Sequence, residues 1–396
     1  MTTETLDEAG PNGGLVAFLA LAAALGTSTT YLLQPAVADV AEALRTDLGT
    51  IGLAFAGGPV GYLVGLVVLV PLVDRHPPSR LLAAAFAALA GTLLLTAVAG
   101  DVLLLGVALC VTGAFSAVGA GLSSLAGRMA PVRRRATVLG TVTAGIAGGI
   151  LAGRIVGGWL SEQLGWRMML GLVALTCVLV AVCCLRLLPT RPATTEGGLL
   201  AGLRALPGLF VRYGELRVAS GRGALWFFAF CALWAGLAVA LSAPPYSYSA
   251  ERIGLYALAG LSGLAATRLA GVWTDRVGPR RVILLGLAPA GLAAAASAVA
   301  LDSPLLVIAC LATVDVGLFA AQVANQSTVL AIDPGAPARF NSAYMAVYFV
   351  GGSLGTACGA LVAEWYGWPP VAALVTAAIG LAAVLSLAGR PVPAGV

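Results

Sequence analysis

The segment Gly-Val-Trp-Thr-Asp-Arg-Val-Gly-Pro-Arg-Arg, residues 271–281, joins two long apolar runs of the chain. A related segment, Leu-Val-Asp-Arg-His-Pro-Pro-Ser-Arg, occupies residues 72–80, so an Asp-Arg pair recurs 201 residues apart. The Gly-Trp pair at 165–166 recurs 202 residues later, and Asp101 recurs as Asp302. Landmarks that keep one offset indicate two copies of one structural unit.

Apolar runs long enough to cross a bilayer surround these landmarks. Of the 396 residues, 60% are hydrophobic and only 10% are charged, whereas soluble domains have roughly a quarter charged residues. Runs of roughly 20 residues suit membrane helices and are about twice the length of a barrel strand. We therefore predict an all-α integral membrane protein with 12 transmembrane helices. The runs cover residues 14–33, 51–73, 81–99, 102–125, 136–160, 168–188, 224–243, 253–272, 282–300, 304–332, 338–362 and 371–387.

The repeat predicts two six-helix bundles. Six spans separate the copies, an even number, so both copies have the same orientation and the repeat is parallel. The linker between them contains arginines and apolar residues, which fits an amphipathic helix on anionic lipid or a disordered tether. The predicted parts are a tail at 1–13, bundles at 14–188 and 224–387, a linker at 189–223 and a tail at 388–396.

Arginine supplies all 22 basic residues and sets the predicted orientation. Cytoplasmic loops of membrane proteins are enriched in basic residues, and 17 of the 22 arginines fall on one side of the predicted spans. The arginines of the predicted cytoplasmic loops account for the net charge of +5. We therefore expect no nucleic-acid partner. The acidic N-terminus lacks the basic region of a signal peptide. We expect a protein of the inner cell membrane with both termini cytoplasmic.

Several classes of chemistry are excluded by composition. Without lysine the chain has no P-loop lysine and no Schiff-base lysine, and with His76 alone it has no histidine-pair metal motif. The seven cysteines all lie in apolar runs, where thiols behave as small hydrophobic groups. We expect no enzyme activity, no cofactor and no metal site.

The segment at 271–281 resembles the G-x-L-x-D-R-x-G-R-R signature of the major facilitator superfamily, and the resemblance covers essentially the whole chain. It implies a twelve-helix transporter of small molecules that works by alternating access, with a path between helices 1, 4, 7 and 10. We expect a monomer. In that family these loops hold the cytoplasmic gate closed, so the resemblance implies a gating role, against a plain structural turn, for Asp74, Arg75, Asp275, Arg276 and Arg280.

The fifth predicted span resembles the G-x-x-x-G-P-x-x-G-G stretch of drug/proton antiporters. Its glycines, at 149, 153, 157 and 158, favour close helix packing. Arg154 stands where those antiporters have proline, and the arginine of their fourth span is absent from residues 102–125. Arg154 either snorkels toward the membrane surface or holds an anionic substrate or a coupling carboxylate.

The tenth predicted span contains an ionisable residue, Asp315, about 18 Å along the helix from Ser303. Together with Phe319, Gln322 and Gln326 it forms a polar stripe at helical spacing. A charge inside the bilayer is costly and defaults to a functional candidate. We assign Asp315 to proton coupling, with a purely structural pairing as the alternative.

Further candidates for substrate contact lie on spans 1, 7 and 11. The first span ends in a Tyr-x-x-Gln-Pro stretch similar to one seen in drug exporters, and the others have aromatic stripes, for which packing is the alternative. Tryptophans 166, 365 and 368 are expected to be interfacial anchors. The full set of predicted substrate-binding residues is Tyr31, Gln34, Arg154, Trp226, Trp234, Gln322, Gln326, Tyr344 and Tyr348.

These features predict a secondary transporter that exports small amphipathic organic compounds in exchange for protons. One acid in a wide apolar cavity suits poorly hydrated substrates better than sugars. Two alternatives stay open: proton-coupled uptake of a small organic anion, with Arg154 as the counter-charge, and a membrane sensor that no longer transports.

Overall fold

The structure is a computed structural model that describes residues 11–190, 199–333 and 337–388. Within this part every regular element is a helix. The helices form two compact units. Unit 1 contains Met1–Leu44, Gly57–Gly197 and Ser249–Leu255, and unit 2 contains Arg45–Ala56, Gly198–Tyr248 and Tyr256–Val396. Each unit is built mainly from one half of the sequence and includes a short segment from the other half.

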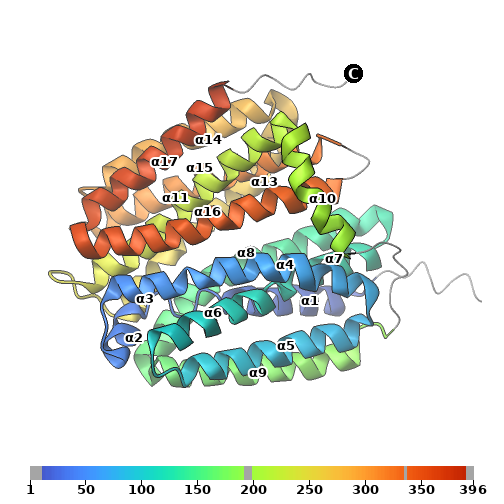
Figure 1. Cartoon of the computed structure of the whole chain (residues 1–396), viewed down its shortest axis with the longest axis horizontal. Helices are drawn as coiled ribbons and strands as arrows, with labels where there is room; N and C mark the ends of the chain where they lie inside the picture. Colours follow the sequence, from blue (N-terminus) through green and yellow to red (C-terminus); the bar gives the residue numbers. More distant parts are fainter. Residues whose placement is uncertain (1–10, 191–198, 334–336, 389–396) are drawn as a thin grey trace, which may run out of the picture. The chain divides into compact units, whose positions relative to one another are not determined.

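Unit 1 is an all-helical bundle in which α1 packs on α8 and α5 on α9 (Figure 1). Its helices are α1 (Gly13–Ser28), α2 (Val37–Leu44), α4 (Gly57–Arg75), α5 (Pro78–Ala97), α6 (Val102–Ser116), α7 (Val118–Met129), η1 (Val132–Arg134), α8 (Arg135–Leu164), α9 (Trp166–Leu187) and α12 (Ala250–Leu255).

Unit 2 repeats this plan, with α11 packed on α16 and α14 on α17 (Figure 1). Its helices are α3 (Leu48–Phe55), α10 (Leu199–Arg212), α11 (Gly214–Ser242), η2 (Tyr256–Ala259), α13 (Gly260–Val277), α14 (Pro279–Ser297), α15 (Pro304–Leu330), α16 (Pro337–Tyr366) and α17 (Trp368–Ala388).

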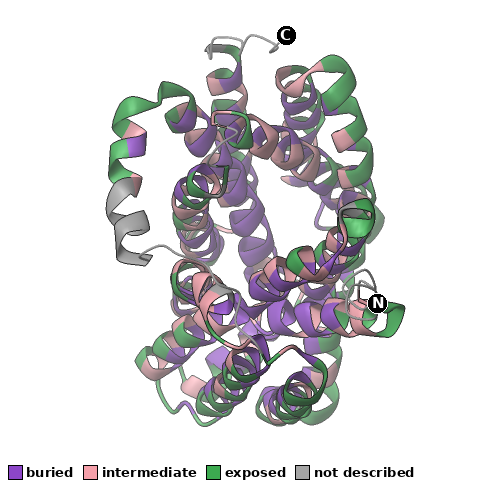
Figure 2. Ribbon diagram, turned by 90° about the vertical axis from the view of Figure 1, so that its right-hand side faces the viewer, coloured by how far each residue is buried: buried purple, intermediate pink, exposed green. Residues whose placement is uncertain are grey.

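Eleven helical stretches in the described part are long and apolar enough to cross a membrane, and the sixteen-residue α1 supplies a shorter twelfth. Figure 2 shows buried residues on the helix faces that meet other helices and exposed residues on the opposite faces. The exposed faces are apolar, with Leu103, Leu185 and Leu292 each more than half exposed, as a surface in contact with lipid requires. The twelve-helix all-α membrane fold is confirmed.

Glycines hold the paired helices together. A Cβ atom on Gly149 or Gly153 of α8 would collide with a carbonyl oxygen of α1, from Ala24 or Ser28. In unit 2, a Cβ atom on Gly355 of α16 would likewise collide with the carbonyl oxygen of Phe228 of α11. Backbones this close require residues without a side chain. The prediction that these glycines serve packing is confirmed.

Four predicted spans are interrupted. Span 1 leaves the helix after Ser28, so the predicted end near residue 33 is wrong, and span 2 is broken at Ala56 between α3 and α4. Span 4 is broken at Ala117, and span 8 passes from α12 through η2 to α13. Ser353 stabilises one break, because its Oγ donates to the Ala56 carbonyl at 2.7 Å. Interrupted helices line the binding sites of many transporters, because their free backbone groups contact substrates and ions.

The predicted linker at 189–223 is shorter in the structure, since α11 already begins at Gly214. Within it α10 is a helix, and Arg217 donates to the carbonyls of Phe210 and Val211 at its C-terminal end. Residues 191–198 of the linker, residues 1–10 of the N-terminal tail and residues 389–396 of the C-terminal tail lie outside the described residues.

Candidate functional site

The polar stripe of α15 faces other helices of the protein. The edge of the Phe319 ring meets Phe230 of α11, with ring centres 5.8 Å apart. Gln322 accepts a 2.7 Å hydrogen bond from the Tyr344 hydroxyl of α16, and Gln326 donates to Asn341 at 2.9 Å. All three contacts lie inside unit 2. The stripe therefore packs against an aromatic ring of α11 and against polar groups of α16.

An aromatic wall stands beside this stripe. Phe227 stacks on Tyr348 with ring centres 4.0 Å apart, and Trp226 meets the same tyrosine edge-on at 4.9 Å. Phe230 continues the wall toward Trp234, 6.5 Å away. We call these side chains, with Phe319, Gln322, Gln326, Asn341 and Tyr344, the aromatic–amide cluster. It brings together six of the predicted substrate-binding residues: Trp226, Trp234, Gln322, Gln326, Tyr344 and Tyr348.

Asp315 lies one helical turn from the cluster, on the same face of α15 as Phe319. Its side chain is 1% exposed and sits near the middle of a 27-residue apolar helix. Gly263 of α13 lies against it, because a Cβ atom there would come within 3.2 Å of the Asp315 backbone and 2.7 Å of the Phe319 ring. The absence of a side chain at 263 lets α13 lie close to the Phe319 ring and to the backbone of Asp315.

The second group of predicted residues lies in unit 1. Arg154 of α8 is 2% exposed, and its Nε donates to Oε1 of Gln34 at 2.7 Å. Its guanidinium lies over the Tyr31 ring, 4.9 Å from the centre. The snorkelling alternative is therefore wrong, because the side chain turns into the bundle. We call Tyr31, Gln34 and Arg154 the arginine cluster.

The break in span 1 makes the arginine cluster possible. Tyr31 and Gln34 lie between α1 and α2, in turns closed by backbone hydrogen bonds from Tyr31 to Ser28 and from Gln34 to Tyr31. Thr30 in the same turn donates to Ser116, the last residue of α6, at 2.9 Å. The interrupted ends of spans 1 and 4 thus meet beside Arg154.

Of the predicted gating residues, Arg280 makes a hydrogen bond at the end of a helix. Arg280 donates to the carbonyl of Leu387 at 2.6 Å, a cation at the C-terminal end of α17. In unit 1 a contact of the same kind comes from Arg128, which donates to the Val73 carbonyl in the last turn of α4 and was not predicted. Asp275 and Arg276 have exposed side chains, and Arg75 is half-buried. The side chain of Asp74 lies outside the described part of the structure.

Sequence reasoning missed two polar residues of unit 2. Asn325 of α15 is 1% exposed and donates to the Ala219 carbonyl at 2.9 Å. A buried amide inside an apolar run was a detectable signal, since such groups are costly in a membrane. Arg222 was placed in the linker, but it lies inside α11, one turn before Trp226. The late predicted start of that span concealed it.

The family follows from comparison with known proteins. The model of the Major Facilitator Superfamily matches residues 17–332. This chain is a member of the major facilitator superfamily. Two bacterial relatives match it over most of their lengths. The first is "Uncharacterized transporter YgaY" of Escherichia coli O157:H7, to which this major facilitator is 30% identical. The match extends over 357 residues, which are 90% of this chain and 91% of the relative.

The second relative is "Probable transporter SCO4007" of Streptomyces coelicolor, 31% identical over 376 residues, 93% of this chain and 86% of the relative. Solved structures share the fold. A bacterial homolog of the human lysosomal transporter Spinster, inward-facing and occupied, has a TM-score of 0.75 at 14% identity and covers 94% of this chain and 96% of its own. A mutant of the nucleoside transporter NupG has a TM-score of 0.71 at 14% identity, with 93% and 98% covered. This major facilitator is a multi-pass membrane transporter of small molecules.

Proposed function

We propose that this transporter exports small amphipathic organic compounds from the cytoplasm in exchange for protons, as a monomer in the inner membrane with both termini cytoplasmic. The observation that supports it best is Asp315, a carboxyl group 1% exposed in the middle of α15 and one turn from the aromatic–amide cluster. In this proposal Asp315 takes up a proton from outside as substrate leaves, and releases it to the cytoplasm before the next substrate binds.

The aromatic–amide cluster supports the amphipathic class of substrate. Its rings offer flat apolar surfaces, and amide and hydroxyl groups from Gln322, Gln326 and Tyr344 interrupt them at a few points. Sites for drug-sized molecules combine apolar walls with a small number of placed polar groups. A sugar needs many more hydrogen-bond partners than this cluster supplies. Amphipathic substrates fit the drug/proton antiporter-like branch of the family, which the fifth-span glycines also favour.

The decisive experiment measures proton movement in proteoliposomes with a pH dye inside. Lipophilic cations, neutral drugs and organic anions are added in turn to wild type and to Asp315→Asn. We expect one class of compound to trigger a proton flux in the wild type. In the variant this flux should be at least tenfold smaller. Glu215→Gln, which removes an exposed carboxylate at the start of α11, is the matched control and should keep its flux.

The arginine cluster favours a second function, proton-coupled uptake of a small organic anion. A buried guanidinium already oriented by Gln34 and Tyr31 is suited to binding a carboxylate. The same assay separates the two functions. In uptake, protons and anion move in the same direction and the flux depends on Arg154. In export, protons move against the substrate. A membrane sensor would show no flux with any compound, in wild type or variant.

A further inference from the structure

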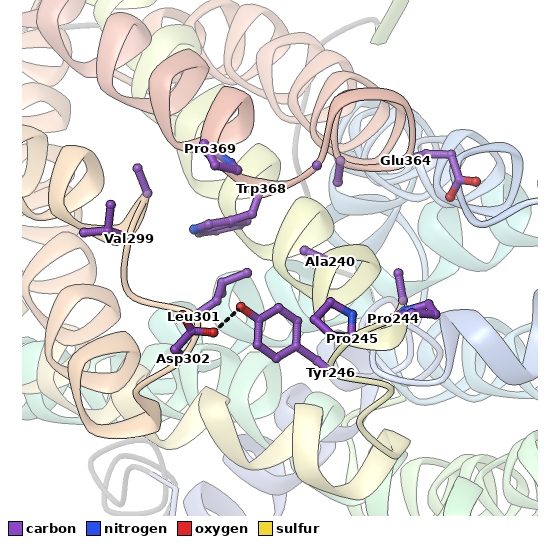
Figure 3. Close-up of a pocket in the computed structure, with 14 residues that line it drawn as sticks. Ala240, Pro244, Pro245, Tyr246, Val299, Leu301, Asp302, Glu364, Trp368 and Pro369 are labelled. Atoms are coloured by element: carbon purple, nitrogen blue, oxygen red, sulfur yellow. Dashed lines mark hydrogen bonds between the residues drawn. The ribbon is translucent and has the colours of Figure 1, made fainter.

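Unit 2 contains a cavity of about 540 Å³, and none of the residues that line it belongs to the aromatic–amide cluster. It lies where the connections α11–α12, α14–α15 and α16–α17 meet, and we call it the loop pocket (Figure 3). Nine of its fourteen lining residues are alanine, proline, valine or leucine. Its size falls within the range of sites for drug-sized ligands. Neither the sequence motifs nor the proposed transport cycle gives this pocket a role.

Two aromatic side chains, each with a hydrogen bond to another residue, form part of the pocket wall. Trp368 was expected to be an interfacial anchor, but it is 4% exposed and its Nε1–H donates to the Ser297 carbonyl at 2.6 Å. Because its one polar group is used inside the bundle, it offers the pocket only ring surface. Tyr246 donates its hydroxyl to Asp302 Oδ1 at 2.8 Å, so its ring is fixed at the edge of the pocket (Figure 3).

Two carboxylates provide the charge. Asp302 and Glu364 both line the pocket and stand on opposite sides of it in Figure 3. The hydrogen bond to Asp302 raises the pKa of the Tyr246 phenol, as expected when a phenol donates to an ionised carboxylate. Among the described residues that line the pocket, none is basic. The pocket therefore has a negative charge that its own walls do not neutralise.

We propose that the loop pocket binds an organic cation with an apolar body. The carboxylates of Asp302 and Glu364 attract the charge, and the rings of Trp368 and Tyr246 contact the body and add cation–π attraction. An anion would be repelled by both carboxylates, and a neutral compound would lose the electrostatic part of the attraction. This site goes beyond the proposed transport cycle and does not depend on proton coupling by Asp315.

The test uses the full chain in lipid nanodiscs and radiolabelled tetraphenylphosphonium as the probe, with empty nanodiscs as the background. All variants also contain Asp315→Asn, so that the carboxyl group of the transport proposal does not contribute to the attraction of the cation. We expect saturable binding. Adding D302N with E364Q should weaken it about tenfold, because two partly exposed charges and their contact with the cation are lost. Tetraphenylborate, of the same shape and opposite charge, should not compete.

The repeat offers a matched control for the charge change. Asp101 and Glu162 precede Asp302 and Glu364 by 201 and 202 residues and lie in unit 1. D101N with E162Q removes the same charge, and asparagine at 101 can still cap α6. We expect this pair to leave the affinity within twofold. The proposal is overturned if no saturable binding is found, if D302N with E364Q binds as tightly as its parent, or if tetraphenylborate competes equally well. Elution volume in size-exclusion chromatography confirms that each variant is folded.

Discussion

Arg154 and Gln34 are joined by a 2.7 Å hydrogen bond between a continuous helix and the broken end of span 1. The bond uses Nε of the guanidinium, and the plane of the group is held over the Tyr31 ring. Only arginine has this flat, forked donor geometry. The contact therefore fixes the orientation of the guanidinium group. A fixed orientation is what the binding of a carboxylate by this group would require.

In the uptake function, Arg154→Lys should reduce transport at least tenfold while leaving the folded protein intact. Lysine keeps the charge but cannot donate from an Nε position while stacking over Tyr31. Initial rates in the proteoliposome assay measure the effect. The control is Arg167→Lys, since Arg167 also lies over an aromatic ring, 4.1 Å from the centre of Trp166, but outside the arginine cluster. Equal losses in the two variants would show that stacked arginines matter for folding rather than for transport.

Gly149→Ala should destabilise the protein by about 1–3 kcal/mol, the usual cost of overpacking. The new Cβ atom would collide with the Ala24 carbonyl, which belongs to backbone and cannot rotate away. Thermal unfolding of the purified protein measures the loss. Its neighbour Gly148 has open space at the Cβ position, so Gly148→Ala should be neutral or slightly stabilising. A loss of the same size at 148 would contradict the packing argument.

Arg280→Gln should lower the free energy of unfolding by up to about 1 kcal/mol, the usual contribution of a cation at a helix C-terminus. The lost contact is the 2.6 Å hydrogen bond to the Leu387 carbonyl. Because the contact is exposed, raising the salt concentration should reduce the difference from wild type. Arg281→Gln is the control, since this exposed neighbour makes the same charge change. If both variants behave alike, the effect comes from net charge and not from the helix end.

The twelve-helix fold was predictable because its signals are local or periodic. Apolar length identifies the spans, and the glycines at 149, 153 and 157 recur near 351, 355 and 359, where they pack the equivalent helix pair. The helix breaks were not predictable in the same way. The break at Ala56 is followed by two glycines and Pro59, but the group that satisfies its carbonyl is the hydroxyl of Ser353, 297 residues away. Such a partner is visible only after folding.

The candidate site was predictable where a polar group lies in an apolar run. Asp315 and Gln322 stood out because each is costly in lipid unless it faces protein. The direction of Arg154 was not predictable, because snorkelling and turning inward are equally open to a long side chain until Gln34, 120 residues away, is placed beside it. Asn325 was overlooked because the stripe was counted along a single line of the helix, and its neighbour Gln326 already fitted that line.

Asp39→Asn should stabilise the protein near pH 7. Partial burial, followed by the charges of Glu162 and Glu42, raises the pKa of the Asp39 carboxyl above its usual value. An acid whose pKa is higher in the folded state binds its proton more readily when folded. The stability it contributes is therefore present at low pH and is lost as the pH rises through the folded pKa. Asparagine, which stays neutral, should raise the midpoint of thermal unfolding at pH 7. The difference should shrink as the pH falls and disappear below the usual carboxyl pKa of 3.8.

Asp47, a little further along the chain, provides the opposite case. Hydrogen bonds from the side chain and the backbone N–H of Thr50 lower the pKa of the Asp47 carboxyl. Its contribution to stability is therefore present at neutral pH and is lost as the pH falls through the lowered folded pKa. Asp47→Asn should lower the midpoint at pH 7 and have less effect in acid. Midpoints measured from pH 3 to 8 should move in opposite directions for the two variants. A shift of the same sign in both would mean that net charge, and not the local surroundings of each carboxyl, sets the response.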